Sequence, residues 1–193
     1  METKKTIIIS NFDDIQNPEY GGGGAFIIHE VAKYLAKTFS VIVLTGIYPG
    51  AKNQHIDGVY YRRIGTYLFG AKVGQLLFQF LLPFYAVKET YDIWLESFTT
   101  PFSTACLQLF TKKPVIGITH FLNAEEKSKE YKLPFFIIEQ LGLKTYNYFI
   151  ALSPQIKERI RLFNTHANIQ VIPNGIKKPS DMYINMKRGS TLF

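Results

Sequence analysis

The chain has 193 residues, which is enough to bury a proper hydrophobic core in one large domain. Its single cysteine, Cys106, excludes an internal disulfide framework and a thiolate zinc site. The net charge of +7 comes from scattered basic pairs and not from a long basic run interleaved with aromatic residues, so no nucleic-acid partner is expected. The N-terminus shows no apolar signal-peptide core, and we expect a cytoplasmic location.

Short β-branched runs alternate with segments of helical spacing along the chain. Residues 6–9 predict the first strand, and residues 25–37 predict a helix. Strands at 41–45 and 59–64 follow, and residues 68–88 predict a long helix that is apolar on most faces. Further strands are predicted at 93–95, 115–119, 148–152 and 169–172, with helices beginning at Pro101, spanning 133–148, and following the Ser153 N-cap and Pro154.

This alternation predicts an α/β fold with a doubly wound, mainly parallel, Rossmann-like sheet. In such sheets ligands bind beyond the carboxyl ends of the strands. The residues just past the predicted strands are therefore the candidates for a site. They are Asn11, Glu96, His120, Ser153 and Asn174.

Four consecutive glycines, residues 21–24, lie between the first predicted strand and its helix. Glycines at a helix entry allow a ligand to approach bare backbone, where the first N–H groups and the helix dipole favour negative charge. A phosphate or an anionic sugar is the natural occupant. A flexible loop without a ligand fits the glycines equally well.

Several other motifs are incomplete. The dinucleotide-binding fingerprint needs a glycine where Phe26 stands. The Gly-Lys-Ser/Thr triplet of a phosphate-binding loop does not occur, and neither does the Gly-x-Ser-x-Gly nucleophile elbow of a hydrolase. Asp13 and Asp14 lack further metal-binding neighbours, so we interpret them as a polar loop and expect no metal. His29 lies in a predicted helix beside Glu30, where a solvated face is expected.

Two candidate side chains follow neighbouring predicted strands. His120 heads a loop, and its imidazole suits proton handling or hydrogen bonding to a phosphate or hydroxyl. Glu96 lies at the matching place on the preceding strand. It is expected either to hold a sugar hydroxyl or to cap the helix region that begins at Pro101.

Several segments together resemble the N-terminal half of family 4 glycosyltransferases, which have the two-domain GT-B fold of the glycogen synthase-like superfamily. The glycine loop 18–24 with residues 29–32 resembles the family's first loop and helix, and residues 118–120 resemble its strand ending in a histidine. Residues 41–46 resemble the second strand, and residues 151–153 with 171–176 resemble the exit toward the second domain. The family usually has Asp where this chain has Lys177, so the linker differs there.

The resemblance implies a division of the chain and a set of roles. Residues 1–176 are the expected acceptor-binding domain, and residues 177–193 a linker and the truncated start of a missing C-terminal domain. The donor is a nucleotide-diphosphate sugar, with no cofactor and usually no metal, and transfer retains anomeric configuration. Gly22, Gly23 and Gly24 are implied neighbours of the donor diphosphate, and His120 a catalytic-site contact to the donor sugar. Glu96 and Asn174 are candidate acceptor or sugar contacts.

The leading hypothesis is thus the acceptor-side half of a retaining glycosyltransferase for cell-envelope polysaccharide, inactive without its donor-binding domain. A non-catalytic subunit that partners a separate catalytic domain, and half of a sugar-nucleotide epimerase of similar fold, stay open as alternatives. The acceptor is a sugar or a lipid-linked sugar. Residues 68–87 are apolar enough for a peripheral contact at the inner face of a membrane, but also fit a core helix kinked at Pro83.

Overall fold

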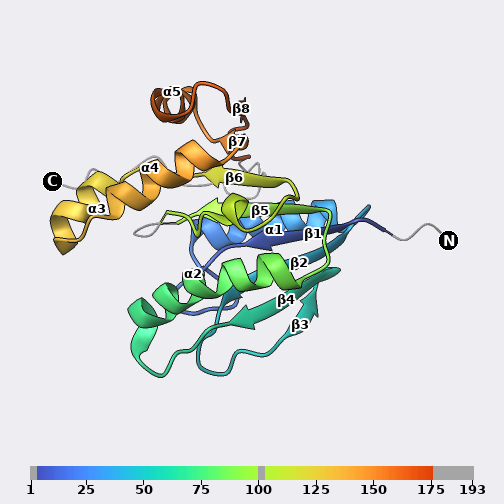
Figure 1. The fold of residues 1–193 in the computed structure, drawn as a ribbon. Coiled ribbons are helices and arrows are strands. Elements are labelled where there is room, and N and C mark those ends of the chain that lie inside the picture. The colour runs from blue at the N-terminus through green and yellow to red at the C-terminus, as the bar shows by residue number, and fades with distance from the viewer. Residues whose placement is uncertain (1–3, 100–102, 176–193) are drawn as a thin grey trace, which may run out of the picture.

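The computed structural model describes residues 4–99 and 103–175, which form one eight-stranded sheet with helices on both faces (Figure 1). The strands are β1 (Thr6–Ser10), β2 (Ser40–Gly46), β3 (Gln54–Ile56), β4 (Val59–Ile64), β5 (Ile93–Phe98), β6 (Val115–Thr119), β7 (Tyr148–Ala151) and β8 (Asn168–Val171). The helices are α1 (Gly23–Leu35), α2 (Gly70–Lys88), α3 (Ala124–Tyr131), α4 (Phe135–Thr145) and α5 (Pro154–Phe163).

The strand order is β3-β4-β2-β1-β5-β6-β7-β8, and every neighbouring pair is parallel except β3 with β4. This confirms the predicted doubly wound, mainly parallel sheet. The chain builds outward from β1 through β2 and β4, and then returns through α2 to place β5 on the other side of β1. The strand order therefore reverses between β1 and β5, which is where such sheets open a crevice for ligands.

Two elements escaped the sequence prediction because neither carries the expected apolar period. Strand β3 is a short edge strand that pairs antiparallel with β4 through the Asp57-Gly58 turn, where both residues have positive φ (50° and 82°). Helix α3 has the sequence AEEKSKEY, with Glu125 and Glu126 in its first turn, and buries only Ala124. A polar helix of this kind has no apolar stripe from which the sequence could predict it.

The helix predicted to begin at Pro101 is not observed in the described residues that follow it. Pro101 itself lies outside the described residues. Between Ser103 and β6, the helical structure consists of the short 3-10 turn η1 (Leu107–Leu109). Ser103 and Cys106 have φ of 56° and 53°, and this left-handed backbone cannot continue a right-handed helix.

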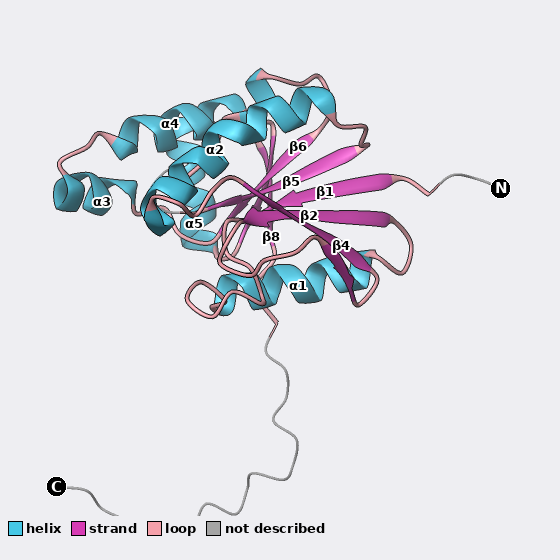
Figure 2. Ribbon diagram, turned by 90° about the horizontal axis from the view of Figure 1, so that it is seen from below, coloured by secondary structure: helices cyan, strands magenta, loops and turns pink. Residues whose placement is uncertain are grey.

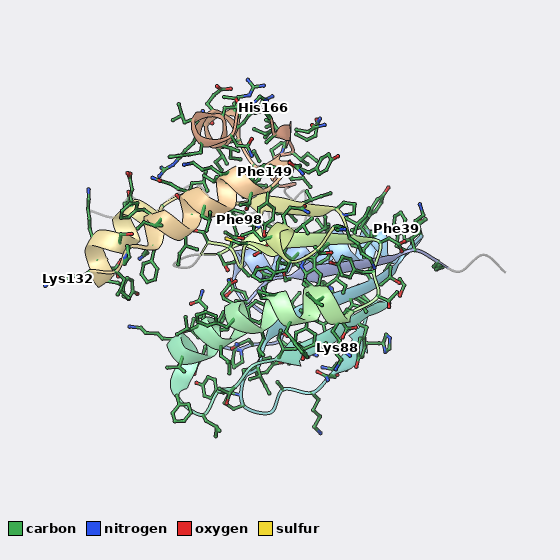
Figure 3. The ribbon with its side chains drawn as sticks, viewed as in Figure 1. Phe39, Lys88, Phe98, Lys132, Phe149 and His166 are labelled. Atoms are coloured by element: carbon green, nitrogen blue, oxygen red, sulfur yellow. The ribbon has the colours of Figure 1, made fainter. Side chains whose placement is uncertain are left out.

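The two faces of the sheet bury separate cores. The larger core lies under α2, α4 and α5 and contains Trp94, Phe98 and Phe149. The rings of Phe98 and Phe149, both labelled in Figure 3, pack in a T-shaped arrangement with centroids 6.0 Å apart. The other core is covered by α1, and Figure 2 shows α1 on the side of the sheet opposite α2 and α4.

His29 of α1 is buried, which corrects the expectation of a solvated face. It is only 5 % exposed, because α1 packs this side of the helix against β4. Its Nδ1 lies 2.9 Å from the Tyr61 hydroxyl, and its Nε2 lies 3.1 Å from the Asp57 carboxylate. The imidazole thus ties α1 to the hairpin formed by β3 and β4.

Candidate functional site

A pocket of about 460 Å³ opens at the carboxyl ends of the parallel strands, at the point where the strand order reverses. The loops after β1, β6, β7 and β8, the end of β5, and the helices α1 and α2 all contribute to its wall. The lining residues are Asn11, Asp13, Gly23, Gly24, Ile27, Gln75, Ser97, Phe98, Thr99, His120, Phe121, Leu152 and Asn174.

The alternation of side chains along the strands explains why these residues converge. Ile9 of β1, Leu95 of β5 and Ile118 of β6 all belong to the core on the α1 side of the sheet. Successive side chains point to opposite faces, so the residues two and four positions further along face the same side. Ser97, two positions after Leu95 in β5, follows in this way. Asn11, Asp13, Thr99 and His120 come just after the strand ends, and they line the same pocket with the N-terminus of α1.

The glycines of the loop divide into structural and pocket-facing positions. A Cβ on Gly21 would lie 2.5 Å from the Asn17 carbonyl oxygen, so this position requires glycine for close packing. A Cβ on Gly22 or Gly23 would meet nothing within 4 Å. Gly22 is the N-cap of α1 without a side-chain cap, and Gly23 and Gly24 line the pocket. The first turn of α1 carries no acidic residue, so its N–H groups are available to an anion.

A buried ion pair holds the loop that leads into these glycines. The Arg63 Nε of β4 donates to Asp14 Oδ2 at 2.7 Å, and both side chains are almost wholly buried. The Thr45 hydroxyl of β2 also donates to Asp14 Oδ2, at 2.7 Å. The Asn17 side chain then accepts hydrogen bonds from the backbone of Glu19 and Tyr20. Asp14 thus fixes the loop to the sheet, whereas the sequence indicated only a polar loop.

Three polar side chains of the pocket keep unused hydrogen-bonding capacity. Ser97 Oγ, Thr99 Oγ1 and His120 Nε2 are buried and have no hydrogen-bond partner within residues 4–99 and 103–175. Burial lowers the pKa of His120, which favours the neutral imidazole. Sequence reasoning had singled out His120 but missed Ser97 and Thr99. The alternation along β5 would have indicated both.

Asp13 supplies a carboxylate to the same pocket. Its Oδ2 would lie 3.6 Å from a Cβ built on Gly24, which places it beside the N-terminus of α1. Burial raises the pKa of Asp13. The described lining of the pocket contains no lysine or arginine.

The other sequence-derived candidates lie in different places. Asn174, after β8, lines the pocket together with His120 and the glycines. Ser153 is the N-cap of α5 and accepts a hydrogen bond from the Ile156 backbone at 3.3 Å. Glu96 does not line the pocket.

Glu96 lies within β5, with the opposite parity to Ser97, and it points into the core below α2 and α4. Its carboxylate accepts hydrogen bonds from the Tyr146 hydroxyl, the Thr104 hydroxyl and the Ala105 N–H. Burial is the main cause that raises the pKa of Glu96 to about 7, and these hydrogen bonds act in the opposite direction. Its contacts are those of a structural residue.

Fold and pocket together define an α/β protein of the Rossmann-like class, with its candidate site at the reversal of strand order. The chain belongs to Glycosyltransferase Family 4, because the model of that family matches residues 21–178. No curated protein sequence matches the chain.

The solved structures that share the fold include the following two. Sucrose-phosphate synthase from Thermosynechococcus elongatus is 13 % identical, with a TM-score of 0.60 over 89 % of this chain and 90 % of that chain. A glycosyltransferase from Rickettsia africae ESF-5 is 18 % identical, with a TM-score of 0.52 over 90 % of this chain and 44 % of that chain. At these identities the likeness concerns the fold alone.

The described residues provide neither a metal-binding cluster nor a membrane-spanning helix. No group of three or more His, Cys, Asp or Glu side chains within residues 4–99 and 103–175 is placed to hold a metal ion. None of the helices in those ranges has the length and apolar character needed to cross a membrane.

Proposed function

We propose that this chain is the acceptor-side domain of a retaining glycosyltransferase that uses a nucleotide-diphosphate sugar. The observation that carries the proposal is the shared pocket. The glycines at the N-terminus of α1 and the unpartnered Nε2 of His120 line one cavity, in a chain that belongs to Glycosyltransferase Family 4. The division at residue 176 stays a proposal, since residues 176–193 lie outside the described residues.

Within this proposal, the backbone of α1 acts on the leaving group. As the bond between the sugar and the diphosphate breaks, negative charge develops on the diphosphate. The N–H groups at Gly22, Gly23 and Gly24 stabilise that charge, and the helix dipole adds to the effect. Neutral His120 forms a hydrogen bond with a hydroxyl of the sugar, and Asn174 is placed to contact the ligand from the β8 side.

An NMR titration of the full chain with UDP-, GDP- and ADP-hexoses tests this assignment. We expect at least one nucleotide sugar to shift the amide signals of residues 22–24 and the imidazole signals of His120. His120→Ala should weaken binding about tenfold, as expected for a lost hydrogen bond in a buried site. His166→Ala, an exposed histidine between α5 and β8, is the matched control. Shifts confined to other parts of the chain would rule out the proposed site.

We further propose that the 193-residue chain does not transfer sugar by itself, because the implied donor-binding domain is needed to complete the cleft. An assay with labelled nucleotide sugars and a panel of sugar and lipid-linked acceptors measures this. Appreciable transfer by the purified chain would contradict the proposal. Should transfer occur, the anomeric proton of the product distinguishes retention from inversion.

A peripheral contact with an anionic membrane is the second part of the proposal. Helix α2 buries Phe78 and Leu82 but exposes Phe80, Phe84 and Val87 by 72 %, 57 % and 69 %. Helix α4 lies on the same side of the sheet (Figure 2) and exposes Ile137 and Leu141, among others. The exposed charges of α2 and α4 are lysines, since Glu139, the acidic residue of α4, is buried. An apolar, acid-free surface of this kind suits an anionic lipid headgroup layer and a lipid-linked acceptor.

Co-sedimentation with vesicles tests this contact. We expect the chain to bind phosphatidylglycerol vesicles more tightly than phosphatidylcholine vesicles, and less tightly at high salt. Phe80→Ser should weaken binding about tenfold, because one buried aromatic side chain is lost from the lipid contact. The control is Tyr34→Ser, since Tyr34 is 71 % exposed on α1, on the opposite face. Equal losses for the two variants, or no vesicle binding, would contradict the contact.

A further inference from the structure

The hydroxyl groups of Ser97 and Thr99 have no assigned role, although they lie in the pocket. Ser97 is only 3 % exposed, and its Oγ has no partner within the described part of the chain. The same holds for Thr99 Oγ1 and for Nε2 of His120, which follows the neighbouring strand. Ser97 has the strand parity of Leu95 and faces the α1 side of the sheet, and Thr99 and His120 line the same pocket just past the ends of β5 and β6.

A buried polar group without a hydrogen bond costs free energy, typically about 1–3 kcal/mol. A ligand that supplies the missing partners recovers that cost on binding. Hydroxyl groups both donate and accept, and a neutral imidazole nitrogen does one or the other. The groups that match this set are therefore themselves hydroxyls, as on a sugar ring. Ile27, Phe121 and Leu152 add apolar surface for the C–H faces of such a ring.

The charge of the pocket further restricts the class of ligand that can bind. Asp13 carries the one formally charged side chain among its described lining residues, and no lysine or arginine lines it. A ligand carboxylate placed beside Ser97 and Thr99 would lose its water and find no cation among the described lining residues to pair with. An uncharged sugar avoids that penalty.

We propose that Ser97, Thr99 and His120 form a subsite for the hydroxyls of a neutral sugar ring, and that the lack of a cation in the described pocket lining makes this subsite reject uronic acids. The proposal rests on the proposed function for the presence of a sugar, and it adds the residues that hold the ring and the class of sugar. In this subsite Ser97 and Thr99 contact the ligand.

NMR titration of the full chain with simple methyl glycosides tests the proposal without any phosphate. The probes are the methyl glycosides of glucose, galactose and mannose, together with the matched uronides. We expect at least one neutral glycoside to shift the signals of Ser97, Thr99 and His120. Its uronide should bind about tenfold more weakly.

Variants in the subsite sharpen the test. Ser97→Ala and Thr99→Val should each weaken binding of the neutral glycoside several-fold, roughly the value of one hydrogen bond. Ser40→Ala and Thr38→Val are matched controls, because both residues are exposed at the far end of the sheet. Phe121→Lys adds a cation at an exposed position of the pocket lining and should narrow the gap between the neutral glycoside and its uronide, which is a gain that misfolding cannot produce.

The outcomes separate this proposal from the proposed function. A uronide that binds as tightly as its neutral counterpart, unchanged binding in both subsite variants, or no shift with any neutral glycoside would overturn the subsite. The proposed function would fail by a different result, in which nucleotide sugars do not shift the NMR signals of residues 22–24 and His120. Neutral glycosides that shift Ser97 while nucleotide sugars shift nothing would retain the subsite and reject the glycosyltransferase donor site.

Discussion

Neighbouring glycines in the loop before α1 have different reasons to be glycine. At Gly21 the nearest obstacle is backbone, the Asn17 carbonyl oxygen, and this cannot rotate away as a side chain can. At Gly23 the space is open and the position lies in a helix, where alanine is the better helix former. Position 21 therefore requires glycine because a side chain would clash there, whereas glycine at position 23 leaves the pocket open to a ligand.

A pair of alanine substitutions separates these roles. Gly21→Ala should destabilise the fold by about 1–3 kcal/mol through overpacking, as measured by urea unfolding. Gly23→Ala should leave stability unchanged or raise it by up to about 1 kcal/mol, yet weaken nucleotide-sugar binding because its methyl group enters the pocket. Equal stability of the two variants would contradict this reading of the loop.

Glu96 makes stability depend on pH. Its pKa is raised to about 7 in the folded state, mainly by burial, while the unfolded chain has the ordinary value near 4.5. The folded state therefore binds more protons between these values, and the stabilising contribution is complete below about pH 4.5. It is lost as the pH rises through about 7, because the carboxyl group must then ionise inside the core.

The variant Glu96→Gln imitates the protonated carboxyl group and removes this dependence. Between about pH 4 and pH 8 the wild-type chain should lose about 3 kcal/mol of stability relative to the variant, from the size of the pKa change. Urea unfolding of both proteins across this range measures the difference. A difference that stays constant with pH would show that Glu96 does not titrate as described.

At the scale of elements, the loop before α1 depends on β4. The Arg63 guanidinium lies under the loop and binds Asp14, the Lys52 carbonyl oxygen and Gln16. Because Asp14 and Arg63 are both buried, removing one partner leaves the other charge uncompensated. The strand thus positions the glycines that line the pocket.

A double-mutant cycle measures this coupling. Asp14→Ala and Arg63→Ala should each destabilise the chain by about 3–5 kcal/mol. The double variant should cost clearly less than the sum of the two, because it leaves no unpaired charge. Hydrogen exchange of the amides in residues 14–22 should speed up in each single variant. Additive free energies of unfolding would count against the ion pair as the anchor of the loop.

The elements that the sequence predicted well are those whose apolar pattern has a clear period. Strands β1, β2 and β6 and helix α1 lie close to their expected ranges, since β-branched runs and helical spacing are direct signs of burial. Helix α3 has no apolar stripe, and β3 is a short edge strand, so neither shows a periodic apolar pattern in the sequence. The expected helix after β5 was wrong because nothing in the sequence foretold the left-handed backbone at Ser103 and Cys106.

For the site, the sequence identified the strand ends but not the faces. His120, Asn174 and the glycines line one pocket, as the parallel-sheet argument requires. Glu96 was placed at the rim because the predicted strand stopped at residue 95, whereas β5 runs to Phe98. Because of this difference of three residues, the sequence prediction left Ser97 and Thr99 out of the site and put Glu96 at the rim instead of in the core. The ion pair of Asp14 with Arg63 joins residues 49 positions apart, which no local pattern reveals.

For the whole molecule, the sheet separates a ligand-binding edge from an apolar surface. The pocket lies at the carboxyl ends of the strands, where it includes the N-terminus of α1, and the exposed residues of α2 and α4 lie on the face of the sheet opposite α1. Gln75 of α2 nevertheless reaches the pocket wall, so the two regions are continuous through this helix. This arrangement suits an acceptor whose lipid part rests on the α2 surface while its sugar enters the pocket.

A crystal structure of the chain with a bound nucleotide sugar, selected by titration, would show whether the glycines and His120 form one donor site. We expect the diphosphate to lie against the N–H groups of residues 22–24 and the sugar ring within hydrogen-bond distance of Ser97, Thr99 or His120. A nucleotide sugar bound instead on the opposite face, or in the exposed hollow between α3 and α4 near Lys129 and Pro134, would contradict it.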